Sequence, residues 1–494
     1  MAAEREVKLN SFLYGMNEQE RDLPNGYYLY LENVELKAKG AKQVANNVVS
    51  ITDYNLRAVL DIAGTIYGLG WYSGNSKVGI WVDLAGTPNL SQPATLYSAS
   101  GKANPFFVTD GTYIYYDNAN KIGRYTISGG SQNGDWASIS GGLSGGVMWN
   151  KYLYGFQGQD VYVVDTTGAT VTKMVSVPAG QTIVQLVPYG QLLAVICTSS
   201  VNEAYMFLCD GVNVTATPWY DDVKIGLGTV FGASLLDGVI TVFINLKNYK
   251  GIRIKKYNGN VFTTEYTYYG RKNLAGNKYV SGASKVKSYT NYVYFITFAT
   301  RPNSASDYEY QIMRYGREDV NKPFNLSVYK SFEIATGNSI DYNDFVIIED
   351  TSPSPTTPMT SVYATILTAS NVTTYSHNLK SGVFTSQPGA VETSILTLDD
   401  SATTKHFKVC ALHFAPLTSG QSVTLKYKKD EETTWTTMGT ANTVGDVHYH
   451  INNIEGTGAS APNFNEISFR FELLGGAELT GFRIKEEDLE DIYG

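Results

Sequence analysis

The sequence predicts an all-β protein, a β-propeller of six or seven blades followed by a C-terminal β-sandwich. Three observations predict it. The composition favours strands and tight turns, since only 17% of the 494 residues are charged while 47 are Gly and 37 are Tyr. A strand unit recurs along the middle of the chain at intervals of 39 to 53 residues. After about residue 390 the strands follow a different rhythm.

The recurring unit is a Gly or Asn turn that opens a strand rich in Tyr, Val and Ile, followed by a second strand. Its starts, 47, 39, 40, 48, 53 and 52 residues apart, are Gly64, Gly111, Asn150, Gly190, Gly238, Asn291 and Asn343. Partner strands are expected at 121–127, 160–165, 204–210, 251–257 and 310–315. A period of about 40 to 50 residues with four short strands is typical of propeller blades. Stacked sandwiches, the alternative, would need roughly 100 residues per unit.

The predicted organisation has three parts. Residues 1–50 show little periodicity and are interpreted as an N-terminal arm that begins the propeller, residues 51–390 as the propeller, and residues 391–494 as the sandwich. Loop insertions are expected at 300–307 and 350–358, which are rich in Ser and Pro. Sandwich strands are expected at 406–414, 422–428, 447–451, 466–473 and 479–485. Their alternation of apolar and polar positions predicts that Ser468, Arg470 and Glu472 face water.

Charge and cysteine content restrict the function classes. The net charge of -8 argues against a nucleic-acid coat, because phosphate neutralisation needs clustered Lys and Arg. No stretch approaches the apolar length of a membrane span or a signal peptide, so a soluble, unexported protein is expected. Three cysteines, Cys197, Cys209 and Cys410, do not form a disulfide framework and are expected to be buried thiols.

Patterns with catalytic or metal-binding potential are weak, and the sequence predicts no enzyme, no cofactor and no metal. The segment from Asp430 to Trp435 partly resembles a sialidase aspartate box but lacks its Ser and Gly, so a hairpin turn is expected. Asp221 and Asp222 are adjacent and would point apart on a strand, whereas general acid/base pairs converge.

The histidines are the weaker metal alternative. His448 and His450 would share one face of a strand, and His406 or His413 would join them across a sheet. No Cys or carboxylate stands at ligand spacing beside them.

One basic cluster is the candidate contact site: Lys247, Lys250, Arg253, Lys255 and Lys256. On a strand that starts at Gly251, Arg253 and Lys255 would share a face. The cluster would then contact DNA phosphate or an acidic neighbouring subunit. The alternative is a solvated hairpin.

Both ends of the chain resemble tail hub or nozzle proteins of short-tailed bacteriophages. At the N-terminus the resemblance lies in Leu13-Tyr-Gly-Met-Asn-Glu, Asp22-Leu-Pro-Asn-Gly and Leu31-Glu-Asn-Val. At the C-terminus, residues 423–428, 434–439, 467–473 and 481–485 are similar to the terminal sandwich of many phage tail proteins.

The resemblance implies a virion structural protein of the tail, assembled in the host cytoplasm. It implies a ring of six copies that contacts the tail adaptor and the fibre or needle proteins, retains packaged DNA and conducts it during ejection. The family carries no catalytic residues. The alternative is a phage baseplate or receptor-binding protein that recognises host surface glycan.

Overall fold

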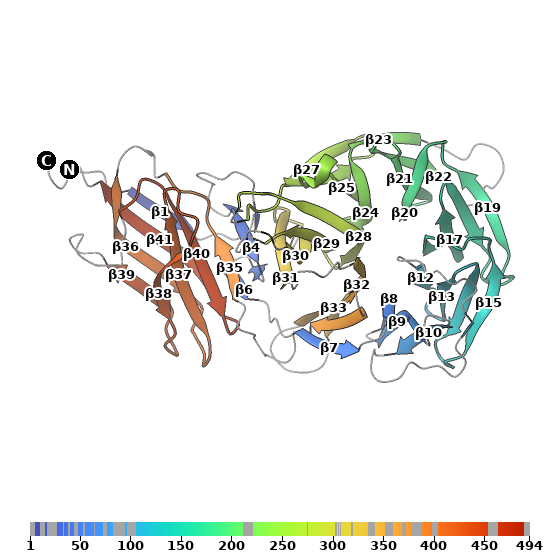
Figure 1. The fold of residues 1–494 in the computed structure, drawn as a ribbon, viewed down its shortest axis with the longest axis horizontal. Coiled ribbons are helices and arrows are strands. Elements are labelled where there is room, and N and C mark those ends of the chain that lie inside the picture. Colours follow the sequence, from blue (N-terminus) through green and yellow to red (C-terminus); the bar gives the residue numbers. More distant parts are fainter. Residues whose placement is uncertain are drawn as a thin grey trace.

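The computed structural model shows an almost entirely β protein with two parts, a propeller and a sandwich (Figure 1). The single helical element is a 3₁₀ turn, η1 (Lys247–Tyr249), among the described residues. Before residue 105 the structure describes little more than the strands. Beyond it the described residues are 105–210, 221–273, 275–301, 308–317, 320–333, 341–350, 359–367, 372–377, 388–397, 404–452 and 463–488, with residues 304 and 306.

Seven four-stranded units form the propeller in the described part of the chain. Six of them use consecutive strands: β8–β11 (Asn55–Ile62, Thr65–Tyr72, Lys77–Val82, Ala94–Thr95), β12–β15 (Phe107–Thr109, Tyr113–Asn118, Lys121–Thr126, Gln132–Ser138), β16–β19 (Gly145–Trp149, Tyr152–Gln157, Asp160–Val164, Val171–Ser176), β20–β23 (Gln181–Tyr189, Leu192–Ser199, Glu203–Cys209, Asp221–Leu227), β24–β27 (Thr229–Leu236, Val239–Asn245, Ile252–Tyr257, Phe262–Tyr268) and β28–β31 (Val280–Tyr289, Tyr292–Thr300, Tyr308–Gly316, Asn325–Glu333). The seventh joins β32–β34 (Asp341–Asp350, Met359–Leu367, Val372–His377) to β7 (Val48–Thr52).

The ring is closed by the N-terminal strand β7, which pairs with β34 of the last blade. The innermost strands also contact one another in succession, and β32 contacts β8 of the first blade. This arrangement confirms the predicted propeller. The first six predicted starts mark the second strand of each blade, whereas Asn343 lies inside β32, the first strand of the seventh. The expected insertion at 350–358 lies almost wholly outside the described residues, and half of that at 300–307 lies outside them.

The sandwich consists of two sheets, and phenylalanine side chains from both sheets pack against one another in its core. Phe469 and Phe471 of one sheet each lie 4.8 Å from Phe482 of the other, centroid to centroid. One sheet contains β35 (Gly389–Glu392), β40 (Ile467–Leu474), β37 (Ser422–Lys429) and β38 (Thr436–Ala441). The other contains β39 (His448–Asn452), β36 (Lys405–Phe414) and β41 (Glu478–Asp488).

The N-terminal strands lie mainly in the sandwich, which differs from the expected arm. β1 (Arg5–Leu9) pairs with β41, and so does β6 (Gly40–Gln43), which is paired in turn with β5 (Val34–Lys37). β4 (Tyr30–Glu32) lies between β31 and β35 and links the sixth blade and the sandwich into one nine-stranded sheet. A short parallel pair, β2 (Gly15–Met16) and β3 (Tyr27–Tyr28), precedes it. The pairings of β1 and β6 with β41, and of β4 with β31 and β35, join residues hundreds of positions apart, so no local periodicity reports them.

Tyrosine contributes strongly to the core. Among the residues that the structure describes, seven of the ten largest fully buried side chains are Tyr28, Tyr30, Tyr115, Tyr116, Tyr125, Tyr154 and Tyr315. These tyrosines therefore serve as strand formers that pack in the core. The three cysteine thiols are also free and buried, as expected.

Candidate functional site

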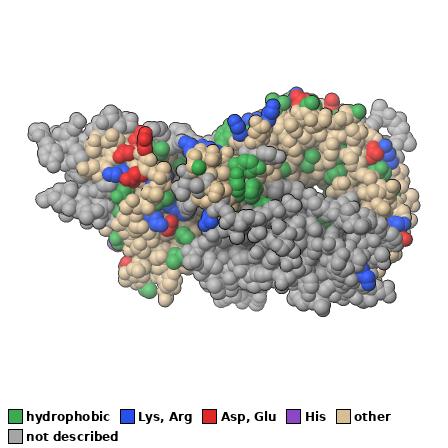
Figure 2. Space-filling view, in the orientation of Figure 1, with side chains coloured by type: hydrophobic (Ala, Val, Ile, Leu, Met, Phe, Trp, Pro, Cys, Tyr) green, Lys and Arg blue, Asp and Glu red, His purple; other side chains and the backbone are tan. Residues whose placement is uncertain are grey.

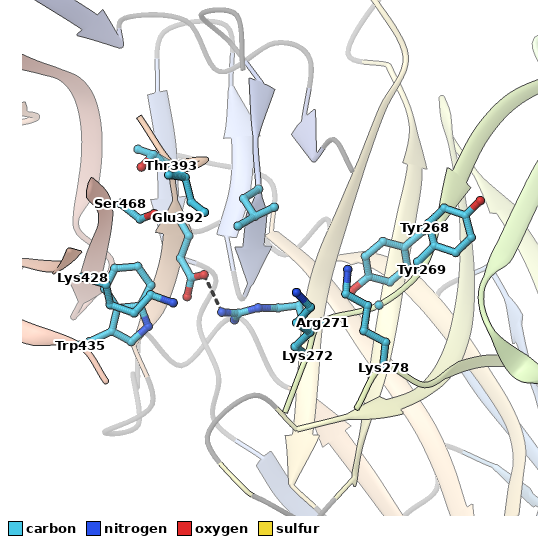
Figure 3. A pocket seen from close by; sticks show the side chains of 13 residues that line it. Tyr268, Tyr269, Arg271, Lys272, Lys278, Glu392, Thr393, Lys428, Trp435 and Ser468 are labelled. Atoms are coloured by element: carbon cyan, nitrogen blue, oxygen red, sulfur yellow. Dashed lines mark hydrogen bonds and ion pairs between the residues drawn. The ribbon is translucent and has the colours of Figure 1, made fainter. Parts of the chain in front are cut away.

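A pocket opens at the junction between propeller and sandwich, with a cavity volume of about 240 Å³. The loop after β27 and the residues before β28 form its propeller side, and β35, β37 and β40 form its sandwich side (Figure 3). Side chains from both parts point toward each other across it. They include Tyr269, Arg271 and Lys278 from the propeller and Glu392, Lys428 and Trp435 from the sandwich.

The carboxylate of Glu392 is 1% exposed and binds two arginines. Nη2 of Arg271 lies 2.6 Å from its Oε2, and Nη1 of Arg470 contacts its Oε1. Burial by itself would raise the pKa of Glu392, but the two guanidinium charges lower it overall, so the carboxylate is ionised at neutral pH. These ion pairs tie the loop after β27 to two strands of the sandwich.

The polar network extends from Arg271 into the propeller and from Arg470 into the sandwich. The guanidinium of Arg271 lies 4.1 Å from the ring centroid of Tyr30 in β4, and Nε2 of Gln311 in β30 donates to the Tyr30 hydroxyl at 3.3 Å. On the sandwich side, Nε of Arg470 donates to Glu472 at 2.9 Å. The network therefore connects the sixth blade, the linking strand and the sandwich.

The expectation that Ser468, Arg470 and Glu472 face water is wrong for the first two. Ser468 is 6% and Arg470 is 7% exposed. The reason is that their face of β40 lies toward the junction, where the propeller loop covers it. Alternation along a strand identifies two faces, but it does not say whether a second domain covers the polar one.

Three lysines also line the pocket. Nζ of Lys428 lies 4.5 Å from the ring centroid of Trp435. Burial lowers the pKa of Lys428. The charge of Glu392 opposes this shift, whereas the charges of Arg271 and Arg470 add to it. Lys272 and Lys278 are partners in an antiparallel β-bridge and are both exposed. The described lining therefore has four cationic side chains and one carboxylate.

A second cavity, of about 740 Å³, lies among the innermost propeller strands and is lined mostly by apolar residues. Lys287 Nζ donates to the Val59 carbonyl at 3.2 Å, and Lys285 has a φ of 95° in the bulge of β28. The described lining of this second cavity contains no Asp or Glu, whereas most glycosidases use two convergent carboxylates. That the chain is not an enzyme stays a prediction.

The structure does not bring the five residues of the basic cluster to one surface. Lys247 and Lys250 are exposed in and next to η1, and Figure 2 shows Lys and Arg side chains on this upper edge of the propeller. Arg253 is half-buried on β26. Nζ of Lys255 donates to the carbonyl of Ile225 in β23 at 2.6 Å, so it bridges two blades.

Lys256 points toward the next blade instead. Its Nζ lies 2.9 Å from the ring centroid of Phe324 and 5.5 Å from that of Tyr315. Burial lowers the pKa of Lys256 to about 8. Of the five residues, only Lys247 and Lys250 are exposed, whereas Lys255 and Lys256 would have to break a contact between blades to meet phosphate or a neighbouring subunit.

The histidines behave partly as expected. His413 pairs with His448 across β36 and β39, and the ring of His450 lies 5.0 Å from that of His448 and 6.4 Å from that of His413. The side chain of His406 lies outside the described residues. In the described part of the chain, no group of three or more His, Cys, Asp or Glu side chains is placed to hold a metal.

The aspartate-box-like segment is a turn between β37 and β38. Asp430 has a φ of 50°, and its Oδ1 accepts hydrogen bonds from the backbone N–H groups of Asn465 and Glu466. This confirms the expected hairpin, and it places Trp435 at the junction pocket.

No sequence motif marks the junction pocket. Glu392 is 121 residues from Arg271 and 78 from Arg470. The one local signal is a carboxylate at the end of a short apolar strand, Gly389-Ala-Val-Glu, because a buried charge needs an oppositely charged partner.

Among the described residues, no helix has the length and apolarity that a membrane crossing requires. No family model matches the chain, and no curated protein matches it. Solved structures similar to it include the N-terminal domain of Nup159 (10% identity, TM-score 0.39, covering 74% of this chain and 99% of that one), the WD40 β-propeller domain of Doa1 (9%, 0.41, 69% and 99%) and the computationally designed Ika8 protein (6%, 0.38, 67% and 99%). The all-β class and the β-propeller of this chain follow from its own strand pairing.

Proposed function

We propose that the chain is a virion structural protein that forms the distal tail tube, the nozzle or hub, of a short-tailed bacteriophage. In this proposal six copies form a ring that contacts the tail adaptor and the fibre or needle proteins. The ring retains packaged DNA and conducts it during ejection. The resemblance at both ends of the chain motivates the proposal.

The observation that carries it is the rigid connection between propeller and sandwich. β4 links them within one nine-stranded sheet, and one hydrophobic cluster includes Phe295 of the sixth blade and Phe471 of the sandwich. The ion pairs of Glu392 add a third connection. Domains joined only by a linker and a small interface move relative to each other, whereas a continuous sheet and core resist such motion. A tube wall needs this stiffness.

The charge of the chain is compatible with a DNA conduit. At a net charge of -8 the protein has no general attraction for phosphate, so DNA would slide past it. Of the basic cluster, Lys247 and Lys250 are the exposed candidates for a local DNA or subunit contact.

The test is the position and copy number of the protein in purified phage particles. Six copies on the tail axis, together with loss of packaged DNA from particles that lack the protein, are expected. A protein absent from particles, or present away from the axis, would contradict the proposal.

The alternative, a receptor-binding or baseplate protein that recognises host glycan, is favoured by one observation. The junction pocket combines aromatic and cationic side chains in a cavity. A monomeric protein with affinity for host surface glycan would support this alternative against the ring.

A further inference from the structure

The cavity at the centre of the propeller has the size of a ligand site. Its volume is about 740 Å³, and its lining comes from the innermost strands of the blades, from β8 of the first to β28 of the sixth. Pockets that hold a drug-sized ligand measure roughly 300–1,000 Å³ and are lined predominantly by hydrophobic side chains. The central cavity agrees with both properties.

The apolar part of the wall extends over four neighbouring blades. The innermost strands of the first four blades each place one half-buried aliphatic side chain in the lining: Leu60, Val108, Val147 and Val184. Each of the four packs against a hydrophobic core cluster of the propeller and keeps part of its surface uncovered. Removal of apolar surface from water is favourable, so an apolar ligand gains free energy by covering these side chains.

Two polar side chains of the lining already bond to the protein between blades. Oε1 of Gln185 in β20 accepts a hydrogen bond from the backbone N–H of Ala233 in β24 at 2.9 Å. Nζ of Lys287 in β28 donates to the carbonyl of Val59 in β8 at 3.2 Å. A hydrogen bond that is broken and not replaced is costly inside a protein. A ligand without charge or strong hydrogen-bonding groups leaves both bonds intact.

From the volume, the apolar wall and these bonds we infer that the central cavity binds an uncharged apolar molecule with a hydrocarbon chain or ring. The hydrocarbon packs against the aliphatic side chains of the first four blades. The inference goes beyond the tail proposal and does not rest on it, since it depends only on the interior of one propeller.

The test measures binding of N-phenyl-1-naphthylamine, an uncharged probe that fluoresces in apolar sites, to the full chain. One probe per chain should bind, and 1-decanol should displace it. Val147→Thr/Val184→Thr keeps the shape of both side chains but places hydroxyls in the apolar contact, so it should weaken binding at least tenfold. Val147→Phe/Val184→Phe, which fills part of the cavity, should weaken binding as well.

The matched control is Val201→Thr/Val261→Thr. It makes the same chemical change at two valines outside the cavity lining, 72% and 50% exposed, and should leave affinity unchanged. Threonine is a good strand former, so both Thr pairs are expected to fold, and circular dichroism checks all variants.

Four results would overturn the inference. The first is no binding of the probe, and the second is an equal loss in the two Thr pairs. The third is wild-type affinity in the Phe pair, which would place the probe outside the cavity. The fourth is displacement by decanoate at least tenfold tighter than by 1-decanol, which would show that charge rather than the apolar wall selects the ligand. The copy number in particles is measured separately, so this inference and the tail proposal fail independently.

Discussion

Replacing Glu392 with Gln tests whether the junction network holds propeller and sandwich together. The substitution keeps the shape of the side chain but leaves the guanidinium groups of Arg271 and Arg470 next to each other without their shared counter-charge. Removing one partner of a buried ion pair costs about 3–5 kcal/mol. Each arginine keeps one further contact, with the Tyr30 ring or with Glu472, so the lower end, about 3 kcal/mol, is expected.

The control is Glu472→Gln. Glu472 also contacts Arg470, but its side chain is 18% exposed and pairs with Lys426 at the rim, where ion pairs contribute about 0–1 kcal/mol. Urea unfolding measures both variants, and hydrogen exchange of the β35 and β40 amides locates the loss at the junction. If the two variants differ by less than about 0.5 kcal/mol, the network has no special role in joining the domains.

The pH dependence gives the same prediction a second readout. The pKa of Glu392 is lowered on folding, so its contribution is present above the ordinary pKa of Glu, about 4.3, and disappears as the pH falls through the folded-state value. The difference in the free energy of unfolding between the wild type and Glu392→Gln should therefore disappear at acid pH. A gap that is constant from neutral pH to the acid limit of the folded state would contradict the proposed role of the charge.

Four further predictions concern other parts of the molecule. Lys255→Met removes the hydrogen bond to the Ile225 carbonyl between two blades and should lower stability by about 1 kcal/mol in urea unfolding; no change would mean that the contact is not maintained. Gly282→Ala places a Cβ 2.3 Å from the Phe231 ring and should cost about 1–3 kcal/mol, whereas an unchanged melting temperature would refute that close packing. Burial raises the pKa of the three cysteine thiols, that of Cys209 to about 12, so a thiol reagent at pH 8 should modify them only after unfolding. Burial and the neighbouring histidines lower the pKa of His450, so the wild type should lose slightly more stability than His450→Gln when thermal unfolding is compared at pH 7.5 and pH 5; equal losses would exclude this contribution.

The blades were predictable because each consists of neighbouring strands joined by short turns. The starts at Gly111, Asn150, Gly190 and Gly238 all precede the second strand of a blade. The last blade does not consist of neighbouring strands alone, because its outer strand, β7, comes from the opposite end of the chain. A strand supplied from so far away follows no local period, so the pattern alone left the choice between six and seven blades open.

The junction pocket was not predictable for a related reason. Its charged residues lie on segments whose alternation is typical of a solvent-facing strand or loop, and this alternation predicts Arg470 on the solvent side. The basic cluster shows the converse, because Lys255 and Lys256 are adjacent in the sequence but contact different neighbouring blades. Nearness along the chain was therefore a poor guide to a shared site.

The all-β class, the repeated blades and the change to a sandwich can be predicted from the amino-acid sequence. These features depend on strand periodicity, turn residues and composition, which act over a few residues. Contacts between distant segments establish the rest: the ring has seven blades, β1 and β4–β6 pair with or beside the C-terminal strands, and Arg271, Glu392 and Arg470 meet in one buried network. Pairing and ionic contacts between distant segments depend on where the folded chain brings them together, and no local pattern records that position.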